Sequence, residues 1–365
     1  MKPTPFYLGA LLLLPACAHQ TSGVEFLPAV EVHATAETTP VGTSNADAAD
    51  DPAIWRNPAD PASSLIIGTD KKAGLYAYSL DGAVKNFVAA GALNNVDLIS
   101  DAKQAIVIAS DRTNPTTSHI ALFSLRFDDP TLRPLGKVAS GPGEAYGFCL
   151  QRHNTDTSMA KVTAYAALKG GTVREVMLTR GEGGSYAGRI TREWKLATQI
   201  EGCVTSPRTG DLFVGEENVG IWRIRTAHSA AQPEIFTTIS PENGLVADVE
   251  GLAYAANDSG PDYLIASSQG DNAYALFDAD SGKLFGRFRI ADGTIDGTSE
   301  TDGIELALGN FGPNYPEGLF VAQDGDNPGA AQNFKLVDWR TVLKALSLPA
   351  PGSKADHSSG STTTE

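Results

Sequence analysis

The chain repeats one short pattern six times, in which acidic or polar residues run directly into an apolar, strand-forming stretch. The six openings are residues 50–54, 94–98, 146–149, 201–204, 248–252 and 302–306. A second β-rich run that ends in polar residues follows each opening, and usually a third. The period is about 40 to 57 residues, without a convincing helical pattern, which is typical of β-propeller blades. We therefore predict an all-β, six-bladed β-propeller, with a β-sandwich or barrel as the alternative.

The propeller is expected to occupy residues 46–348. Residues 21–45 are rich in Thr, Ala and Pro and are predicted to be a linker with an N-terminal strand. A strand near residues 30–35 is expected to close one blade. Residues 349–365 have the composition of a disordered tail.

Residues 1–20 resemble an export signal. Lys2 precedes the apolar residues 6–14, a stretch too short to span a bilayer as a helix. Residues 14–17 (LPAC) resemble a lipobox, which would place a lipid on Cys17, whereas residues 16–18 (ACA) also suit ordinary signal peptidase. Both alternatives predict export, either to the periplasm or outer membrane as a lipoprotein or into the medium.

The formal net charge of −15 argues against nucleic acid or anionic lipid as a partner, because both require a basic surface. Membrane contact is therefore expected only through a lipid anchor, and a monomer is the default expectation. After Cys17 only Cys149 and Cys203 remain. Export makes a disulfide between them possible, and two buried free cysteines are the alternative.

Equivalent positions of the six units would converge on the central channel of a propeller. Six carboxylates at these positions suit a hard cation, with calcium favoured over magnesium because calcium accepts many oxygens in loose geometry. They are Glu201, Glu217, Asp248, Glu250, Asp296 and Asp302.

Three cations stand at equivalent strand ends in the first three units: Lys71, Arg112 and Lys169. In an acidic protein with few cations, such a set favours a phosphate or carboxylate ligand. The sequence contains no phosphate-binding P-loop, no H-E-x-x-H zinc motif and no G-x-S-x-G nucleophile elbow.

Over residues 40–345 the chain closely resembles the β-propeller phytases. The resemblance rests on residues 50–55 (DDPAIW), 65–71 (LIIGTDK), 94–97 (NNVD), 146–150 (YGFCL), 201–203 (EGC), 214–222 (VGEENVGIW), 248–252 (DVEGL), 264–270 (LIASSQG), 295–304 (IDGTSETDGI) and 332–336 (QNFKL). It implies a six-bladed propeller that hydrolyses myo-inositol hexakisphosphate, or its calcium salt, in a calcium-dependent reaction of the 3-phytase type.

The resemblance also implies roles for individual residues. Lys71, Arg112 and Lys169, with Lys72, would bind the substrate phosphates. The catalytic residues would be Tyr146 and Glu201 together with Lys71, Arg112 and Lys169. The active-site calcium ligands would be Tyr146, Glu201, Glu217, Asp248, Glu250, Asp296 and Asp302, with Asp51 nearby. Mainly structural calcium sites would use Asp47, Asn95, Asp97, Gln269 and Asp324. Many members of the family carry an acidic residue where this chain has Gly170.

The mechanism expected from this chemistry is attack on phosphorus by a metal-activated water, without a covalent phosphoenzyme. It would release inorganic phosphate and lower inositol phosphates. Because metal-binding carboxylates must be ionised, neutral or mildly alkaline pH should favour activity. The alternatives are a propeller lactonase or phosphodiesterase and a non-catalytic, calcium-stabilised binding propeller.

Overall fold

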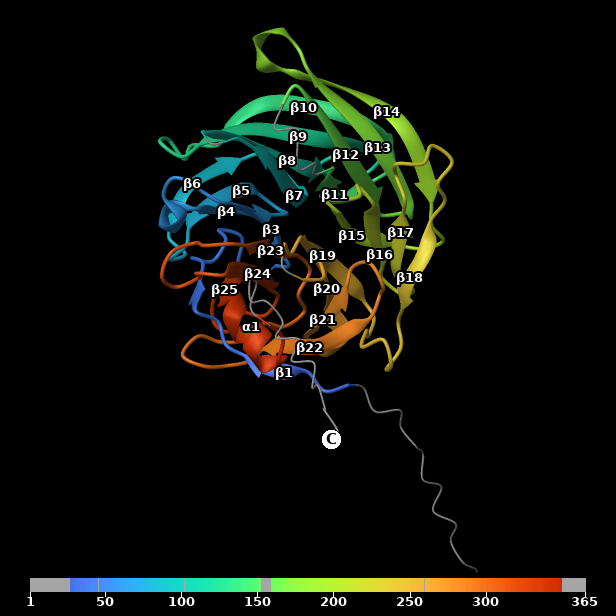
Figure 1. Cartoon of the computed structure of the whole chain (residues 1–365). Helices are drawn as coiled ribbons and strands as arrows, with labels where there is room; N and C mark the ends of the chain where they lie inside the picture. Colours follow the sequence, from blue (N-terminus) through green and yellow to red (C-terminus); the bar gives the residue numbers. More distant parts are fainter. Residues whose placement is uncertain (1–26, 45, 102, 152–158, 259, 350–365) are drawn as a thin grey trace, which may run out of the picture.

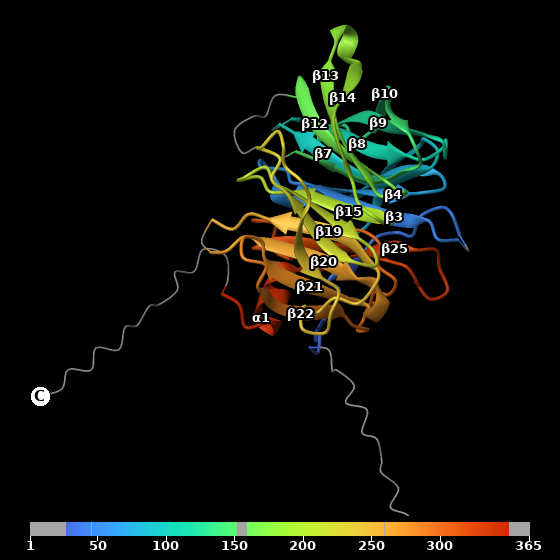
Figure 2. The ribbon, with the colours of Figure 1, turned by 90° about the vertical axis from the view of Figure 1, so that its right-hand side faces the viewer.

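A computed structural model describes residues 27–44, 46–101, 103–151, 159–258 and 260–349. Their strands form six sheets arranged around a central axis, as Figure 1 shows along that axis and Figure 2 from the side. The predicted six-bladed β-propeller is confirmed. Residues 1–20 with Cys17, and the predicted tail from residue 350 onward, lie outside the described residues.

The blades follow one another along the chain, and the first strand of each is innermost. Blade 1 contains β3 (Ala49–Trp55), β4 (Leu65–Asp70), β5 (Gly74–Ser79) and β6 (Val84–Ala89). Blade 2 contains β7 (Leu93–Ser100), β8 (Gln104–Asp111), β9 (Thr117–Arg126) and β10 (Arg133–Pro142). Blade 3 contains β11 (Ala145–Leu150), β12 (Lys161–Leu168), β13 (Thr172–Arg180) and β14 (Tyr186–Lys195).

Blade 4 contains β15 (Ile200–Thr205), β16 (Leu212–Glu216), β17 (Gly220–Ile224) and β18 (Glu234–Thr238). Blade 5 contains β19 (Val249–Ala255), β20 (Tyr263–Ser268), β21 (Ala273–Asp278) and β22 (Leu284–Ile290). Blade 6 contains β23 (Ile304–Leu308), β24 (Gly318–Asp324) and β25 (Asn333–Asp338). The six inner strands contact one another in sequence, and β23 returns to β3, so the ring is closed.

The N-terminal segment supplies two further strands. β1 (Val30–Val32) pairs in parallel with β22 as a fifth strand of blade 5, and β2 (Ala36–Glu37) pairs with β25 as the fourth strand of blade 6. A blade is thus closed from the N-terminus as expected, but by residues 36–37. Residues 30–32 add to blade 5 instead, where Val32 is buried beside the end of β22.

One α-helix, α1 (Trp339–Ala345), occurs in the described residues, where the sequence analysis expected none. Asp338 caps it by accepting from the Arg340 backbone N–H, while Trp339, Val342 and Leu343 are buried against blades 5 and 6. The described part of the chain also contains the short 3₁₀ turns η1 (Pro61–Ser63), η2 (Glu182–Gly184) and η3 (Gln269–Asp271). No helix among the described residues is long and apolar enough to cross a membrane.

The hydrophobic core lies between neighbouring blades. Ile67 and Leu75 of blade 1 belong to the same buried cluster as Val107 and Phe123 of blade 2, and comparable clusters fill the other junctions. Both faces of most inner and middle strands are therefore covered, which explains why their sequences are nearly continuous apolar runs.

The innermost strands of blades 1 to 5 carry a β-bulge close to their first residue. In each, two residues oppose one residue of the next strand, at 50–51, 94–95, 146–147, 201–202 and 250–251. A bulge changes the direction of a side chain and increases the local twist. The first bulge residues form one set of equivalent positions around the channel: Asp50, Asn94, Tyr146, Glu201 and Glu250.

In blades 3 to 5 the second bulge residue is glycine because the next blade approaches closely. A Cβ atom on Gly147 would lie 1.7 Å from the Glu201 carbonyl oxygen, and one on Gly202 would lie 2.1 Å from that of Glu250. Any other residue would push these strands apart. The glycines in the YGF and EGC motifs therefore set the spacing of the functional side chains.

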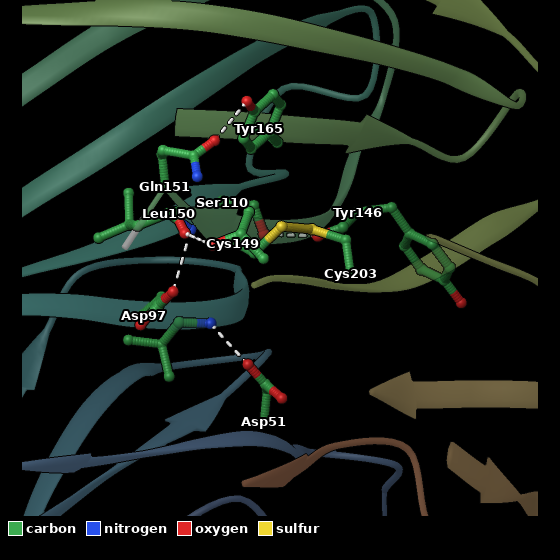
Figure 3. The surroundings of a disulfide bond; sticks show 11 residues. Asp51, Asp97, Ser110, Tyr146, Cys149, Leu150, Gln151, Tyr165 and Cys203 are labelled. Carbon is green, nitrogen blue, oxygen red and sulfur yellow. Dashed lines mark hydrogen bonds between the residues drawn. A yellow bond between two sulfur atoms is a disulfide. The ribbon is translucent and has the colours of Figure 1, made fainter. Parts of the chain in front are cut away.

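Cys149 of β11 and Cys203 of β15 form a disulfide between blades 3 and 4, with 5.7 Å between their Cα atoms. Figure 3 shows the bond beside the channel wall, near Tyr146. The sequence left the pairing open. The bond covalently joins the two strands that carry Tyr146 and Glu201.

Replacing both cysteines with serine is expected to lower the free energy of unfolding by about 4 kcal/mol, since the bond closes a loop of 54 residues. Thermal denaturation should show a Tm lower by several degrees. Reductant should lower the Tm of the unmodified chain similarly and leave the double variant unchanged. Equal Tm values for the two proteins in the absence of reductant would contradict the prediction.

Candidate active site

Three glutamates from blades 4 and 5 form a compact acidic centre at one end of the channel. Oxygen atoms of Glu201, Glu217 and Glu250 lie within 4.8 Å of one another, and all three side chains are buried. Glu201 and Glu250 come from the bulges of β15 and β19, whereas Glu217 follows the end of β16. Strands distant in sequence therefore bring together three carboxylates that the sequence analysis had grouped as metal ligands.

Burial, followed by the charge of Asp50, raises the pKa of Glu201 to about 7. Burial, followed by the charge of Glu201, raises the pKa of Glu250, and burial also raises that of Glu217. Among the described atoms, Glu250 Oε2 is buried without a hydrogen-bond partner. A bound cation would supply the missing partner and offset the repulsion between the carboxylates. The all-oxygen donor set fits a hard cation such as calcium.

These pKa shifts predict how calcium should affect stability at different pH. A carboxyl with a raised pKa binds its proton more tightly in the folded state. Calcium-free protein should therefore lose stability as the pH rises from 4.5 to about 7. Calcium requires the ionised form, so the gain in Tm on adding calcium should be larger at about pH 8 than at about pH 5. Sodium chloride of equal ionic strength serves as the control. An equal calcium effect at both pH values would contradict the prediction.

Lys71 lies beside this centre as a buried cation. Its Nζ atom is 2.7 Å from Asp47 Oδ1, 2.8 Å from Asp50 Oδ1 and 2.8 Å from Asp302 Oδ2, and the residue is 8% exposed. Burial alone would lower the pKa of Lys71, but the three aspartates raise it well above its ordinary value. Lys71 is therefore charged.

Arg112, which follows β8 of blade 2, and Lys169, which follows β12 of blade 3, both lie near the ring of Tyr146 on β11. Arg112 Cζ and Lys169 Nζ each lie 5.1 Å from the centre of that ring. Arg112 also donates to Glu144 Oε1 at 2.5 Å and to Asn94 Oδ1 at 2.7 Å. The three cations proposed from the sequence thus follow the first three blades around the channel, next to the acidic centre.

Tyr146 is held as a neutral phenol. Burial, followed by the charges of Glu201 and Glu250, raises the pKa of Tyr146 far above its ordinary value. Gln199 Nε2 lies 3.4 Å from the Tyr146 hydroxyl and donates to Glu217 Oε1 at 2.6 Å. Gln199 therefore connects the phenol to the acidic centre.

Asp302 is the corresponding residue of blade 6, two residues before the start of β23. Besides Lys71, it accepts from Gln269 Nε2 at 2.8 Å, and burial raises the pKa of its carboxyl. Asp47, Gln269 and Asp302 line a pocket of about 570 Å³. Asp248 lies close enough to Glu217 for its negative charge to help raise the pKa of that carboxyl, after burial. Lys72 is exposed, and its backbone N–H donates to Asp70.

The structure places Asp51 and Asp97 in the channel wall, where each joins two blades. Asp51 Oδ2 accepts from the Val96 backbone N–H, and Asp97 Oδ2 accepts from that of Leu150, both at 2.9 Å (Figure 3). Asn95 lines the same small space within the channel. They are not members of the Glu201 centre, and their role as calcium ligands stays a prediction.

Asp296 and Asp324 lie in a second acidic cluster, between blades 5 and 6. Lys335 Nζ is 2.6 Å from Glu37 Oε2, 2.6 Å from Asp296 Oδ1 and 3.3 Å from Asp324 Oδ2. Burial raises the pKa of Asp324 to about 6. The loop after β22 carries Asp296 to this cluster, so the structure does not group it with Glu201 as the sequence analysis did.

Four residues that the sequence analysis did not single out contribute to the site: Asp50, Asn94, Glu144 and Gln199. Asp50 is equivalent to Glu201 through the bulge, but the pattern of the openings had favoured its neighbour Asp51. Aligning 50–53 with 201–204 without a gap would have revealed the equivalence. Nothing in the sequence pattern marks Glu144 or Gln199.

The phytase family model matches residues 7–352. The chain therefore belongs to the phytase family. The chain is 36% identical over 354 residues to a 3-phytase of Bacillus subtilis strain 168, a match that covers 93% of this chain and 91% of that phytase.

Among solved structures, a chain of the mitotic checkpoint complex has 12% identity and a TM-score of 0.48, covering 91% of this chain and 87% of that one. The aldose sugar dehydrogenase of Escherichia coli also has 12% identity and a TM-score of 0.48, covering 79% of this chain and 96% of that one.

Proposed function

We propose that the chain is a calcium-dependent phytase of the 3-phytase type, which removes phosphate from myo-inositol hexakisphosphate. The observation that carries the proposal is the buried Glu201–Glu217–Glu250 centre next to Lys71, Arg112 and Lys169. Carboxylates alone would repel a polyphosphate, whereas cations alone would not activate water. Carboxylates and cations gathered in one site suit metal-assisted hydrolysis of a phosphate monoester.

Calcium fits the acidic centre because the donors are all oxygen and Glu250 Oε2 is buried without a partner among the described residues. Glu201, Glu217 and Glu250 would hold it, with Asp302 and Tyr146 at the edge. When bound, calcium would offset the negative charge of the rim and activate water for attack on phosphorus.

The chain's own cations would orient the substrate. Lys71 is fixed by aspartates and Arg112 by Asn94 and Glu144, so both present positive charge with little freedom. A preorganised cation loses less entropy on binding phosphate and can stabilise charge on the departing oxygen. Lys169 and the exposed Lys72 would contact further phosphates. The products would be inorganic phosphate and lower inositol phosphates.

We further propose that the second cluster, with Asp296, Asp324 and Glu37, binds calcium for stability. Asp296 Oδ2 and Asn333 Oδ1 are buried there without a hydrogen-bond partner in the described part of the chain. Asp47, Asn95, Asp97 and Gln269 are proposed as additional calcium ligands.

Export as a periplasmic or outer-membrane lipoprotein, or as a secreted protein, is the proposed location, and a monomer the proposed state. The disulfide supports export, since such bonds persist in oxidising compartments. Mass spectrometry of the mature N-terminus tests whether Cys17 carries a lipid.

The test of the proposed function is phosphate release from phytate by protein first stripped of divalent metal. We expect almost none without calcium and a saturable increase as calcium is added. Full activity in chelator would refute calcium dependence. If calcium and phytate bind but no phosphate is released, a binding propeller is indicated. Turnover only of lactones or phosphodiesters would indicate the other alternative.

A further inference from the structure

Asn94 differs chemically from its equivalents in the other blades. It occupies the bulge position that carries a carboxylate in blades 1, 4 and 5 and a phenol in blade 3, and it is 0% exposed. Its side chain is an uncharged amide that can donate and accept at once. It lies in blade 2, between Arg112 and Glu201 of the acidic centre.

The contacts of Asn94 use both ends of the amide. Nδ2 lies 2.6 Å from Glu201 Oε1, 2.9 Å from Asp50 Oδ2 and 3.0 Å from Asn95 Oδ1. Oδ1 accepts from Arg112 Nη1 at 2.7 Å. This orientation is set by the hydrogen-bond network, because the donor must face the carboxylates and the acceptor must face the guanidinium.

A direct ion pair between Arg112 and Glu201 would engage the carboxylate that calcium requires, and Arg112 already forms an ion pair with Glu144. The neutral amide bridges the two groups without cancelling either charge. Arg112 is then held between Asn94 and Glu144, and Glu201 is held with one oxygen on Asn94.

We propose that Asn94 is a positioning residue that fixes Arg112 for phosphate and Glu201 for calcium in one coupled arrangement. The inference rests on the proposed function, since it assigns these partners their roles there. Hydrogen bonds that orient a metal ligand commonly change metal affinity by about 10- to 100-fold when they are lost. The loss of Asn94 should therefore weaken both calcium and phytate binding.

The test uses Asn94→Leu, which keeps the side-chain size and removes all four contacts, and Asn94→Ala as a smaller variant in case leucine is not tolerated. Calcium affinity is measured by calorimetry on the metal-stripped protein, and KM for phytate at saturating calcium. We expect calcium Kd to rise about 10-fold or more and KM to rise as well. Asn57→Ala, a buried asparagine in the loop after β3, is the matched control and should change neither value.

A double-mutant comparison separates positioning from general destabilisation. If Asn94 acts on phosphate through Arg112, adding Asn94→Leu to Arg112→Ala should raise KM less than Asn94→Leu does alone. Folded variants with unchanged calcium Kd and KM would overturn the inference while leaving the proposed function intact. If the unmodified chain releases no phosphate, the proposed function fails, and the calcium titration still decides the role of Asn94 toward Glu201.

Discussion

Replacing Glu201 with glutamine is expected to reduce calcium-dependent phosphate release from phytate by at least about 100-fold. Glutamine has nearly the same shape, so the bulge of β15 and the contact with Gly147 should persist. The change removes one negative charge from a centre whose three carboxylates lie within 4.8 Å of one another. Initial rates measured over a calcium titration should show both a lower maximum and a higher half-saturation.

Glu182→Gln is the matched control for this variant, because Glu182 is an exposed glutamate in η2 and should have no effect. The variant without its buried carboxylate should also be the more stable protein in the absence of calcium, since the raised pKa of Glu201 reports a destabilised charge. An activity equal to that of the unmodified chain would remove Glu201 from the site.

Replacing Lys71 with methionine is expected to cost about 3–5 kcal/mol of unfolding free energy in calcium-free protein near neutral pH. Methionine keeps most of the length of the lysine side chain but leaves Asp50 and Asp302 without their cation, and Asp50 is 1% exposed. Denaturant titration measures the loss. Because burial raises the pKa of Asp302, protonation can neutralise that carboxyl, and the loss should be smaller at acidic pH.

Calcium should separate the two roles of Lys71. Added calcium can restore part of the stability by attracting the same carboxylates, but it cannot replace a cation that faces the substrate phosphate. Stability should therefore recover in part while phytate hydrolysis stays low. Lys103→Met, at an exposed loop position, is the control. A variant with full turnover at saturating calcium would show that Lys71 serves folding alone.

The blade count could be predicted from the sequence because each blade is a local unit. The strands of one blade are close together in the sequence. Residues 65–71 and 74–79, for example, can be recognised from the sequence as two strands joined by a turn. The closing strand could not be located, because β2 is two residues long and is defined by its partner β25, about 300 residues away.

The composition of the candidate site was also largely predictable. Carboxylates and cations recur at equivalent points of the six openings, and equivalent points of a propeller meet at its channel. Glu201, Glu217, Glu250 and Lys71 were found in this way, and the structure brings them into one site.

The sequence by itself determined the blades, the charged residue types and the family. Only the tertiary structure decided which of two adjacent residues faces the site. Asp50 pairs with Lys71, whereas Asp51, one residue later, joins blade 1 to blade 2. The physical reason is that neighbouring residues of a strand point to different sides, so a bulge that shifts the register by one residue exchanges them. The same reason places Asn94 in the site and its neighbour Asn95 in the channel wall.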